Sequence, residues 1–301
     1  MNRRRFLTAS ALSAAGCFTG CATARGPRPI APNSKLNHAC IGVGGMGGAD
    51  ISNIKTHANT QIVALCDVDR ERLAYAAKAF PGARTYTDWR ELLAKEGDRI
   101  DSVNIAVPDH NHTIIATHAM RAGKHVYCQK PLCHEIAECR LLKETARRHG
   151  VVTQLGVQFS AGVGDRMAVA YHKAGVIGAV EHIYLFSNRK GISRIRTLRP
   201  DKTDPVPASL DWDLWIGTAP FRPYAEKVYH PLIWRIWQDF GSGWIGDIGC
   251  HLCSSVWKGL GLTAPISVTA EVQEEWKSDD PIHCSLLYNG PDWGNICGIC
   301  P

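Results

Sequence analysis

Three side chains in this chain of 301 residues have the types and the spacing needed to remove a proton from a hydroxyl group. His251 carries an imidazole, the side chain that exchanges protons near neutral pH, and Asp247 precedes it by one turn of a helix. Lys130 follows residues 126–128, which resemble a strand end, and offers positive charge to an oxygen that becomes negative. Oxidation of an alcohol needs such a base and such a cation together with a hydride acceptor. Lys130, Asp247 and His251 are therefore the predicted catalytic residues.

A glycine-rich turn indicates where the hydride acceptor binds. The turn follows a short apolar run, and Asp67 closes the next apolar run, 20 residues after the last glycine. Gly42 permits a tight turn and Gly44 lets the backbone approach a pyrophosphate. Gly47 lets a helix pack on the strand with its N-terminal N–H groups toward the phosphates. This order of strand, turn, helix, strand and acid predicts a dinucleotide site whose turn residues are Gly42, Gly44, Gly45, Met46 and Gly47.

Asp67 bears on which dinucleotide binds. Its carboxylate is expected at the adenine ribose, where it accepts the two hydroxyl protons and repels a 2′-phosphate. This favours NAD over NADP, although the nearby Arg70 and Arg72 would soften the preference.

The elements that must hold these residues alternate regularly from residue 35 to about 155. Short apolar runs alternate with helical patterns, as in the doubly wound parallel sheet of an α/β fold, whose strands are buried on both faces. The predicted strands are 39–43, 62–66, 103–107, 124–128 and 151–155, with helical spacing at Leu73, Ala76, Ala77 and Phe80 and at Ile136, Cys139, Leu142 and Ala146. Residues 34–155 are accordingly predicted to be a Rossmann nucleotide-binding domain, and residues 156–301 a second, substrate-binding domain.

Tryptophans are concentrated in two segments of the second domain, 211–215 and 234–237. Aromatic faces next to charged groups suit a sugar-binding cleft, but a packed core is the simpler interpretation for most of the tryptophans. Arg235 stands between two tryptophans and is the exception, a predicted substrate-binding residue together with Trp234 and Gln158. The connection 189–207 is the longest in this region and could help to cover the site.

The first 33 residues are expected to be an export leader and not part of the fold. Arg3-Arg4-Arg5-Phe6-Leu7 and the short, weakly apolar stretch 8–18 resemble a bacterial twin-arginine signal. Cys17 and Cys21 each lie in an imperfect lipoprotein cleavage box, so both a soluble periplasmic protein and a lipid-anchored one are open. The leader holds five arginines and no acid, and of the net charge of +6 this leaves +1, which gives no reason to expect nucleic acid as a partner. No later segment is apolar enough to cross a membrane.

The twelve cysteines are scattered through apparent strands and helices instead of being spaced as a disulfide framework. A folded-export route also implies folding in the reducing cytoplasm, so Cys40, Cys66 and Cys128 are interpreted as small buried hydrophobic residues. No metal is predicted, although two C-x-x-C pairs could in principle bind zinc: Cys250 with Cys253 and Cys297 with Cys300.

Residues 34 to about 276 resemble the Gfo/Idh/MocA oxidoreductases, a family that includes glucose-fructose oxidoreductase and inositol dehydrogenase. Three motifs carry the resemblance: the glycine turn with Asp67, Gln129-Lys130-Pro131 for the family's Glu-Lys-Pro, and Asp247-Ile248-Gly249-Cys250-His251 for its Asp-x-x-x-His. Segments 206–215 and 229–235 look like the exported bacterial branch. The resemblance implies that the second domain is α+β, with an open, mainly antiparallel sheet that often serves oligomerisation. The predicted cofactor-binding residues further include Pro108, His112, Gln129 and Lys130.

The sequence departs from the pattern of that family. Gln129 replaces a glutamate and so removes a carboxylate that would hold the charge of Lys130, and Ser254 stands where the family often has an aspartate. A predicted strand at 266–272 gives way to a polar and then Gly/Cys-rich end, so we expect the sheet to be incomplete and the chain truncated. A homo-oligomer is expected only if the sheet is complete.

The sequence thus predicts an exported NAD(P)-dependent oxidoreductase that transfers a hydride from a sugar or polyol and retains its cofactor. Two alternatives stay open. A glycosidase of the same family would use NAD in a redox-neutral cycle, in which oxidation at C3 acidifies the neighbouring C–H, elimination expels the aglycone, water adds and the hydride returns. A non-catalytic carbohydrate-binding remnant would result from the missing part of the sheet.

Overall fold

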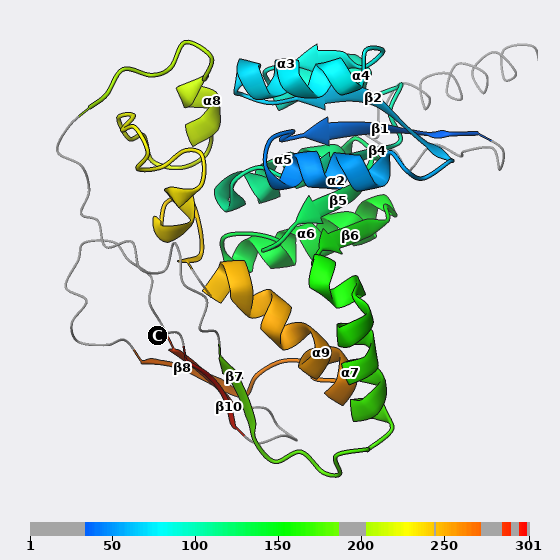
Figure 1. Cartoon of the computed structure of the whole chain (residues 1–301), viewed down its shortest axis with the longest axis vertical. Coiled ribbons are helices and arrows are strands. Elements are labelled where there is room, and N and C mark those ends of the chain that lie inside the picture. Colours follow the sequence, from blue (N-terminus) through cyan, green and yellow to red (C-terminus); the bar gives the residue numbers. More distant parts are fainter. Residues whose placement is uncertain (1–33, 187–202, 244, 272–284, 290–294, 300–301) are drawn as a thin grey trace, which may run out of the picture.

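The computed structural model describes residues 34–186, 203–243, 245–271, 285–289 and 295–299. Its larger sheet has six parallel strands in the order β3-β2-β1-β4-β5-β6, the arrangement of a Rossmann fold (Figure 1). The strands are β1 (Leu36–Ile41), β2 (Thr60–Cys66), β3 (Arg84–Tyr86), β4 (Ser102–Ile105), β5 (His125–Gln129) and β6 (Thr153–Gly156). The predicted doubly wound parallel sheet is therefore confirmed.

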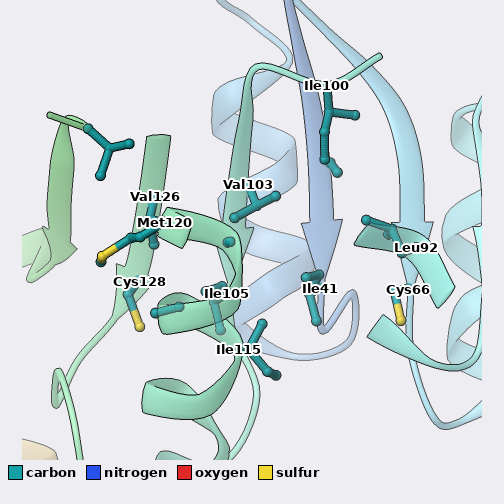
Figure 2. Close-up of a cluster of buried hydrophobic side chains, with 14 of the residues drawn as sticks. Ile41, Cys66, Leu92, Ile100, Val103, Ile105, Ile115, Met120, Val126 and Cys128 are labelled. Atoms are coloured by element: carbon teal, nitrogen blue, oxygen red, sulfur yellow. The ribbon is translucent and has the colours of Figure 1, made fainter. Parts of the chain in front are cut away.

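Helices cover both faces of this sheet because its strands are apolar on both sides. Alternate side chains of β1 point to opposite faces, so Ala39 and Ile41 pack in one buried cluster and Cys40 in another. Figure 2 shows the first cluster, where Ile105 of β4 packs with Ile115. The helices are α2 (Met46–Ile54) and α3 (Arg70–Ala79) on one face, and α4 (Trp89–Glu96), α5 (His112–Arg121) and α6 (Ile136–His149) on the other.

The predicted and observed strands differ mainly at their ends and at β3. The strand expected over 39–43 is β1, which ends at Ile41 because Gly42, with a φ of 82°, turns the chain out of the sheet. The sequence pattern does not reveal β3, a short and partly exposed edge strand without an apolar run. Its Arg84 and Tyr86 side chains donate to the buried carboxylate of Glu96 at 2.5 Å, so polar contacts fix this strand.

The second region contains a four-stranded, mainly antiparallel sheet in the order β7-β10-β9-β8, as predicted. β10 runs parallel to β7, and the other two pairs are antiparallel. Helices α7 and α9 lie side by side, and α9 contacts β7 (Figure 1). The bounds are β7 (Ile183–Phe186), β8 (Ser267–Glu271), β9 (Ser285–Asn289), β10 (Asn295–Ile299), α7 (Val163–Lys173) and α9 (Cys250–Leu260). The strand expected over 266–272 is therefore β8.

Residues 203–243, which we call the aromatic segment, join the two parts of the fold. They contain α8 (Trp212–Ile216) and the short helix η4 (Ile233–Ile236), and α8 lies beside the carboxyl ends of the parallel strands (Figure 1). Arg70 at the start of α3 donates its backbone N–H to Ser209 at 2.8 Å, and the His110 ring lies 3.2 Å from the carbonyl oxygen of Phe240. The tryptophans form a packed core, as the simpler interpretation predicted, with at most 6% exposure of Trp212, Trp215, Trp234 and Trp237.

The cysteines are only partly as expected. Cys40, Cys66 and Cys128 are buried thiols, in agreement with the prediction. Cys133 and Cys139, however, form a disulfide that the sequence pattern did not suggest. Helical spacing places Cys139 on the core face of α6, but it does not show that the loop before this helix brings Cys133 to the same point.

Several expectations fall outside the described residues. These are the leader 1–33 with Cys17 and Cys21, most of the connection 189–207, and Cys300. Within the part of the chain that the structure describes, we find no helix with the length and apolar character needed to span a bilayer.

Close packing at the glycine turn predicts a difference between two glycine substitutions. A Cβ on Gly47 would lie 1.9 Å from the carbonyl oxygen of Gly42, whereas a Cβ on Gly82 would meet nothing within 4 Å. Gly47→Ala is expected to lower the free energy of unfolding by roughly 1–3 kcal/mol, and the control Gly82→Ala to change it by less than about 0.5 kcal/mol. Urea unfolding followed by circular dichroism measures both. Equal stability of the two variants would contradict the close approach of α2 to the turn.

Candidate active site

A cavity of about 610 Å³ lies at the carboxyl edge of the parallel sheet, and the aromatic segment and the start of α9 help to close it. This edge is where open α/β sheets bind their ligands. The cavity brings together predicted residues from distant parts of the chain: Gly42, Gly44, Gly45, Met46, Asp67, Pro108, Gln129, Lys130, Gln158, Trp234, Arg235, Asp247 and His251. The predicted cofactor, catalytic and substrate residues therefore share one space, and only Gly47 and His112 do not line it.

The glycine turn has a shape that only glycine allows. Gly42 has a φ of 82°, and a Cβ there would lie 2.4 Å from the carbonyl oxygen of Ala106, just beyond β4. Gly47 packs against Gly42, so α2 begins directly behind the turn. At Gly45, by contrast, a Cβ would meet open space. The first backbone N–H groups of α2 thus lie beside the cavity, in the arrangement that binds a pyrophosphate.

Asp67 follows the end of β2 with its carboxylate held by two backbone donors. Val43 donates its N–H to one oxygen at 2.9 Å, and Asp69 donates its N–H to the other at 3.0 Å. Burial raises the pKa of Asp67, and these two hydrogen bonds act in the opposite direction. Each oxygen keeps acceptor capacity, so the carboxylate can still receive the hydroxyl groups of a ribose.

Arg72 brings positive charge to the same end of the cavity. Its guanidinium Nε lies 3.3 Å from the carboxylate of Asp69, which anchors the side chain. A Cβ built on Gly44 would lie 2.4 Å from Nη1 of Arg72, so the guanidinium lies directly over the turn. The charge of Arg72 therefore stands between the predicted pyrophosphate and ribose positions.

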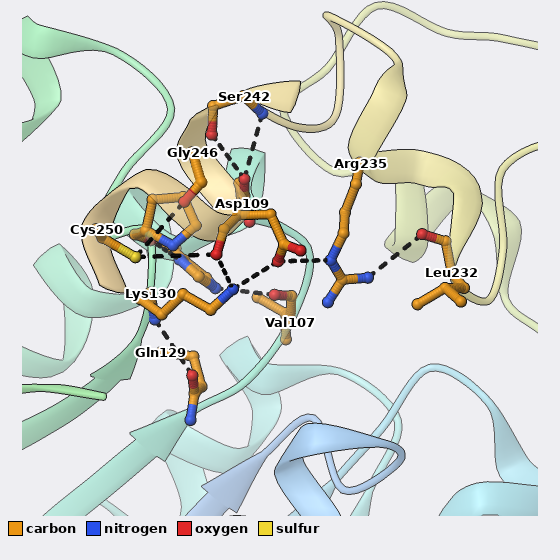
Figure 3. Close-up of polar contacts among 12 residues, drawn as sticks. Val107, Asp109, Gln129, Lys130, Leu232, Arg235, Ser242, Gly246 and Cys250 are labelled. Carbon is orange, nitrogen blue, oxygen red and sulfur yellow. Dashed lines mark hydrogen bonds and ion pairs between the residues drawn. The ribbon is translucent and has the colours of Figure 1, made fainter. Parts of the chain in front are cut away.

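A partly buried ion pair forms the centre of the site (Figure 3). Lys130 Nζ donates to Asp247 Oδ1 at 2.5 Å and to the carbonyl oxygen of the same residue at 2.7 Å. Arg235 Nε donates to the same Oδ1 at 3.2 Å, so one carboxylate receives two cations. Burial acts to raise the pKa of Asp247, but Lys130 and then Arg235 outweigh it, and the pKa is lowered.

Asp247 lies in a π-helical turn, η5 (Ile245–Gly249), that runs directly into α9 and its residue His251. Turns of this kind occur often at functional sites because they change which side chains face a neighbour. The His251 ring packs against the ring of Phe159, with 4.6 Å between their centroids. Phe159 belongs to the short helix η2 (Gln158–Ala161), which also places Gln158 at the cavity.

The structure explains the two residues, Gln129 and Ser254, at which the sequence departs from the motifs of the family it resembles. Gln129 donates from Nε2 to both carboxylate oxygens of Asp50 at 2.9 Å, where a glutamate would face a like charge. The counter-ion for Lys130 is instead Asp247. Ser254 donates from its hydroxyl group to Asp165 of α7 at 3.1 Å, which ties α9 to α7.

Arg235 reaches the cavity in contact with an aromatic ring. Its guanidinium carbon lies 4.3 Å from the ring centroid of Trp234, within the range of a cation–π contact. Trp234 lines the cavity but is only 6% exposed, so most of its surface belongs to the core of the aromatic segment. The ring therefore lies against the guanidinium, and Arg235 has several N–H donors to offer a ligand.

His112 does not line the cavity, although the sequence predicted that it contacts the cofactor. The residue is 1% exposed and lies between the carbonyl oxygens of Val107 and Pro131, outside the cavity. Its place at the start of α5 turns the ring toward the two loops and away from the cavity.

Three residues at or beside the site were not found from the sequence. Asp109 and Phe159 line the cavity, and Asp50 holds Gln129 from behind. Asp50 could have been found from its spacing, because it lies one helical turn after Gly47, on the face that packs against the sheet. Asp109 and Phe159 follow strand ends in short irregular turns, where periodicity carries no signal.

The first C-x-x-C pair lies on α9, beside the ion pair. Cys250 Sγ lies 3.7 Å from the carbonyl oxygen of Gly246 and 3.9 Å from that of Asp247, as a helical thiol commonly does. Among the described residues, no group of three or more His, Cys, Asp and Glu side chains could hold a metal ion.

Comparison with known families identifies the fold. The model of an oxidoreductase family with an NAD-binding Rossmann fold matches residues 36–157, and that of the C-terminal alpha/beta domain of the same family matches residues 196–286. The chain therefore belongs to the Gfo/Idh/MocA oxidoreductase family, and its first domain is an NAD-binding domain.

Individual relatives are distant. A levoglucosan dehydrogenase from Pseudarthrobacter phenanthrenivorans is 26% identical over 219 residues, which make up 72% of this chain and 46% of that protein. A glycosyl hydrolase family 109 protein from Solibacter usitatus is 32% identical over 164 residues, 50% of this chain and 36% of that protein. The crystal structure of GenD2 from gentamicin A biosynthesis, in complex with NAD, has a TM-score of 0.66 at 24% identity and covers 91% of this chain and 68% of that chain. The chain thus spans less than half the length of the levoglucosan dehydrogenase and of the glycosyl hydrolase family 109 protein.

The lowered pKa of Asp247 predicts how stability depends on pH. A carboxylate of this kind stabilises the fold fully above the pKa of about 4 that it has when unfolded. The contribution is lost as the pH falls through the lower pKa of the folded state. The stabilities of the wild type and Asp247→Asn should therefore differ most at neutral pH and converge as the pH falls through the lowered pKa of the folded state. Urea unfolding across this range measures the difference, with the exposed Asp213→Asn as control. A difference that does not change with pH would contradict the lowered pKa.

The surroundings of Asp67 predict that NAD binds more tightly than NADP. The carboxylate can accept ribose hydroxyl groups and would repel a 2′-phosphate, while Arg72 reduces the discrimination. Titration of both dinucleotides into the apo protein, followed by tryptophan fluorescence, measures the two dissociation constants. Asp67→Asn should narrow the ratio between them, and Arg72→Ala should widen it. Tighter binding of NADP by the wild type would remove Asp67 from this role.

Proposed function

We propose that this protein is an NAD-dependent oxidoreductase that oxidises a hydroxyl group of a sugar or polyol. The observation that carries the proposal is the shared cavity, in which Lys130, Asp247 and His251 stand in the same space as the glycine turn. Groups for proton transfer beside a dinucleotide site are what alcohol oxidation requires. The similarity to a protein named levoglucosan dehydrogenase supports a carbohydrate as the substrate class.

The residues around the glycine turn fit a dinucleotide. Open space at Gly45, the N-terminus of α2 and the acceptor capacity of Asp67 would together hold the pyrophosphate and the ribose. When bound, NAD⁺ supplies the acceptor for the hydride that leaves the alcohol carbon.

The remaining chemistry belongs to the side chains at the ion pair. Lys130 would place its ammonium group at the substrate oxygen, where negative charge develops, and His251 would take the hydroxyl proton. Asp247 would keep the ammonium group in position through the 2.5 Å contact. Arg235, fixed on Trp234, would donate to a second hydroxyl group of the substrate.

Substitution of Lys130 and of His251 tests this assignment. Lys130→Ala and His251→Ala should each lower kcat by roughly a hundredfold or more, with NAD binding nearly intact. Sugars, polyols and glycosides are screened first by the absorbance of reduced nicotinamide, and the substrate found is used for the variants. Lys78→Ala, on the exposed side of α3, should turn over like the wild type. Unchanged turnover in either active-site variant would remove that residue from the mechanism, and loss of NAD binding in both would assign them to the fold.

A redox-neutral glycosidase is the second candidate. The 32% identity to a glycosyl hydrolase family 109 protein over 164 residues favours it. Such an enzyme would oxidise C3, eliminate the aglycone, add water and return the hydride, so reduced nicotinamide would not accumulate. Chromogenic glycosides separate the candidates, because a glycosidase releases the aglycone, whereas the oxidoreductase oxidises a hydroxyl group of the sugar and leaves the glycosidic bond intact. Sugar binding with neither product would indicate the carbohydrate-binding remnant.

The proposed location is outside the cytoplasm. The run Arg3-Arg4-Arg5-Phe6-Leu7 supports export by the twin-arginine route, into the periplasm or onto a membrane through a lipid on Cys17 or Cys21. The disulfide between Cys133 and Cys139 also supports this location, because disulfides persist in oxidising compartments.

For a protein in which the smaller sheet is complete, the proposed assembly is a homo-oligomer formed through that sheet. Tyr184 and Phe186 lie on the same face of β7 and are 71% and 72% exposed. An apolar sheet surface of this kind is typical of a protein interface.

Export of the folded protein predicts that it keeps its cofactor. NAD can be loaded in the cytoplasm, where it is made, whereas no comparable pool exists outside to replace it. Walls from both the Rossmann domain and the aromatic segment enclose the cavity, which supports retention. Protein purified from the periplasm and dialysed should therefore keep bound nicotinamide and turn over without added NAD, through a redox-neutral cycle on one or two substrates. Protein that emerges free of cofactor, and then forms reduced nicotinamide only with added NAD, would show an ordinary dehydrogenase.

A further inference from the structure

His112 is a buried histidine whose two ring nitrogens both face carbonyl oxygens. Nδ1 lies 2.8 Å from the oxygen of Pro131, and Nε2 lies 2.8 Å from the oxygen of Val107. A carbonyl oxygen only accepts hydrogen bonds, so each nitrogen must donate an N–H to make its contact. A neutral imidazole has one N–H and the imidazolium has two. Both contacts are therefore hydrogen bonds only when His112 carries a positive charge.

The two carbonyl groups lie at positions where proline reduces the supply of backbone donors. Val107 precedes Pro108, and Pro131 itself has no N–H, so neither loop can continue a regular ladder of backbone hydrogen bonds. A buried carbonyl group needs a donor from elsewhere. At both points the donor is the ring of His112.

The groups that face the ring from neighbouring elements favour the charged form. They are Cys128 of β5, which favours the imidazolium when its sulfur is a thiolate, Asp109 of η1 (Asp109–Asn111), and the carbonyl group of Pro131. Burial alone would lower the pKa of His112, but these groups outweigh burial and raise it to about 9. Asp109 is itself held in place, since the Ser242 hydroxyl donates to it at 2.9 Å (Figure 3).

We propose that His112 is a positioning residue, a buried imidazolium that fixes the Lys130 loop against the Val107–Pro108 loop. The Lys130 loop leaves β5 and carries the ammonium group, and the Val107–Pro108 loop leaves β4 and forms the neighbouring part of the cavity wall. Joined through one ring, the two loops keep a constant separation, and with it the distance from the ammonium group to the cofactor side of the cavity. The effect on turnover rests on the function proposed above for Lys130, whereas the charge of the ring does not.

Nuclear magnetic resonance of the full chain labelled with ¹⁵N in histidine tests the charge directly. At about pH 7.5 an ordinary histidine is mostly neutral, but His112 should show two protonated nitrogens that exchange slowly with solvent. His112→Gln identifies the signal, and His57→Gln, an exposed site on the same domain, is the control. A single protonated nitrogen at this pH would overturn the proposal. The measurement on the wild type stands even where His112→Gln folds poorly.

The pH dependence of stability provides a second test. Because the pKa of His112 is raised on folding, its stabilisation is complete below about pH 6.5 and is lost as the pH rises through about 9. The stability difference between the wild type and His112→Gln should therefore shrink over this interval, and that for His57→Gln should not. A constant difference for His112→Gln would contradict the charged ring.

The positioning role is tested through Lys130. His112→Gln should change the rate at which an amine reagent modifies Lys130 by about threefold or more, a readout that needs no substrate, and His57→Gln should leave that rate unchanged. With a substrate in hand, kcat should fall at least tenfold while the dissociation constant of NAD changes by less than about threefold. Unchanged Lys130 reactivity in a folded His112→Gln protein would overturn the positioning role. A changed reactivity without any substrate turnover would instead reject the proposed oxidation and leave the positioning role in place.

Discussion

The ion pair between Lys130 and Asp247 joins residues 117 positions apart and sets the arrangement of everything around it. Lys130 leaves the parallel sheet after β5, and Asp247 stands in the π-helical turn that opens α9. Each charge is partly removed from water in this place, so each is stabilised by the other. Arg235 adds a second cation to the same carboxylate, so the two cations and one carboxylate leave a net positive charge at the centre.

Several contacts between the Rossmann domain and the aromatic segment are also polar. A cavity must stay open here, so the two regions cannot be held together by a continuous apolar core. They meet instead through the His110 ring at Phe240, through Asp109 and Ser242, and through His134 Nε2, which lies 3.2 Å from the carbonyl oxygen of Gly241. Behind this layer the sheet is apolar on both faces, and the aromatic segment has a separate core of its own. Rigid cores thus lie on both sides of the site, and directional hydrogen bonds fix the space between them.

Sequence reasoning found the parts of the fold in which apolar residues recur with the period of a strand or a helix. Strand and helix periods disclosed five of the six parallel strands, and strand, turn and acid disclosed the dinucleotide site around Gly42 and Asp67. Periodicity failed at β3, where Arg84 and Tyr86 are held by the buried Glu96, and at the disulfide of Cys133. It also failed for contacts between distant segments. Nothing local in the sequence shows that Asp247 receives Lys130 and Arg235 together, or that the ring of His112 turns from the cavity toward two carbonyl groups.

The large sequence separation of these contacts also affects the order in which the parts of the molecule fold. Asp109 meets Ser242 across 133 residues, and His110 meets Phe240 across 130. Long loops must close before such contacts contribute, which makes topologies of this kind slow to fold. The Rossmann sheet, whose strands all lie within residues 36–156, can form without them, whereas the site exists only after the aromatic segment and α9 have docked. During synthesis the nucleotide-binding sheet can therefore form well before the site does. In the interval the tryptophans of the aromatic segment are exposed, so chaperones can bind the chain and proteases can cleave it.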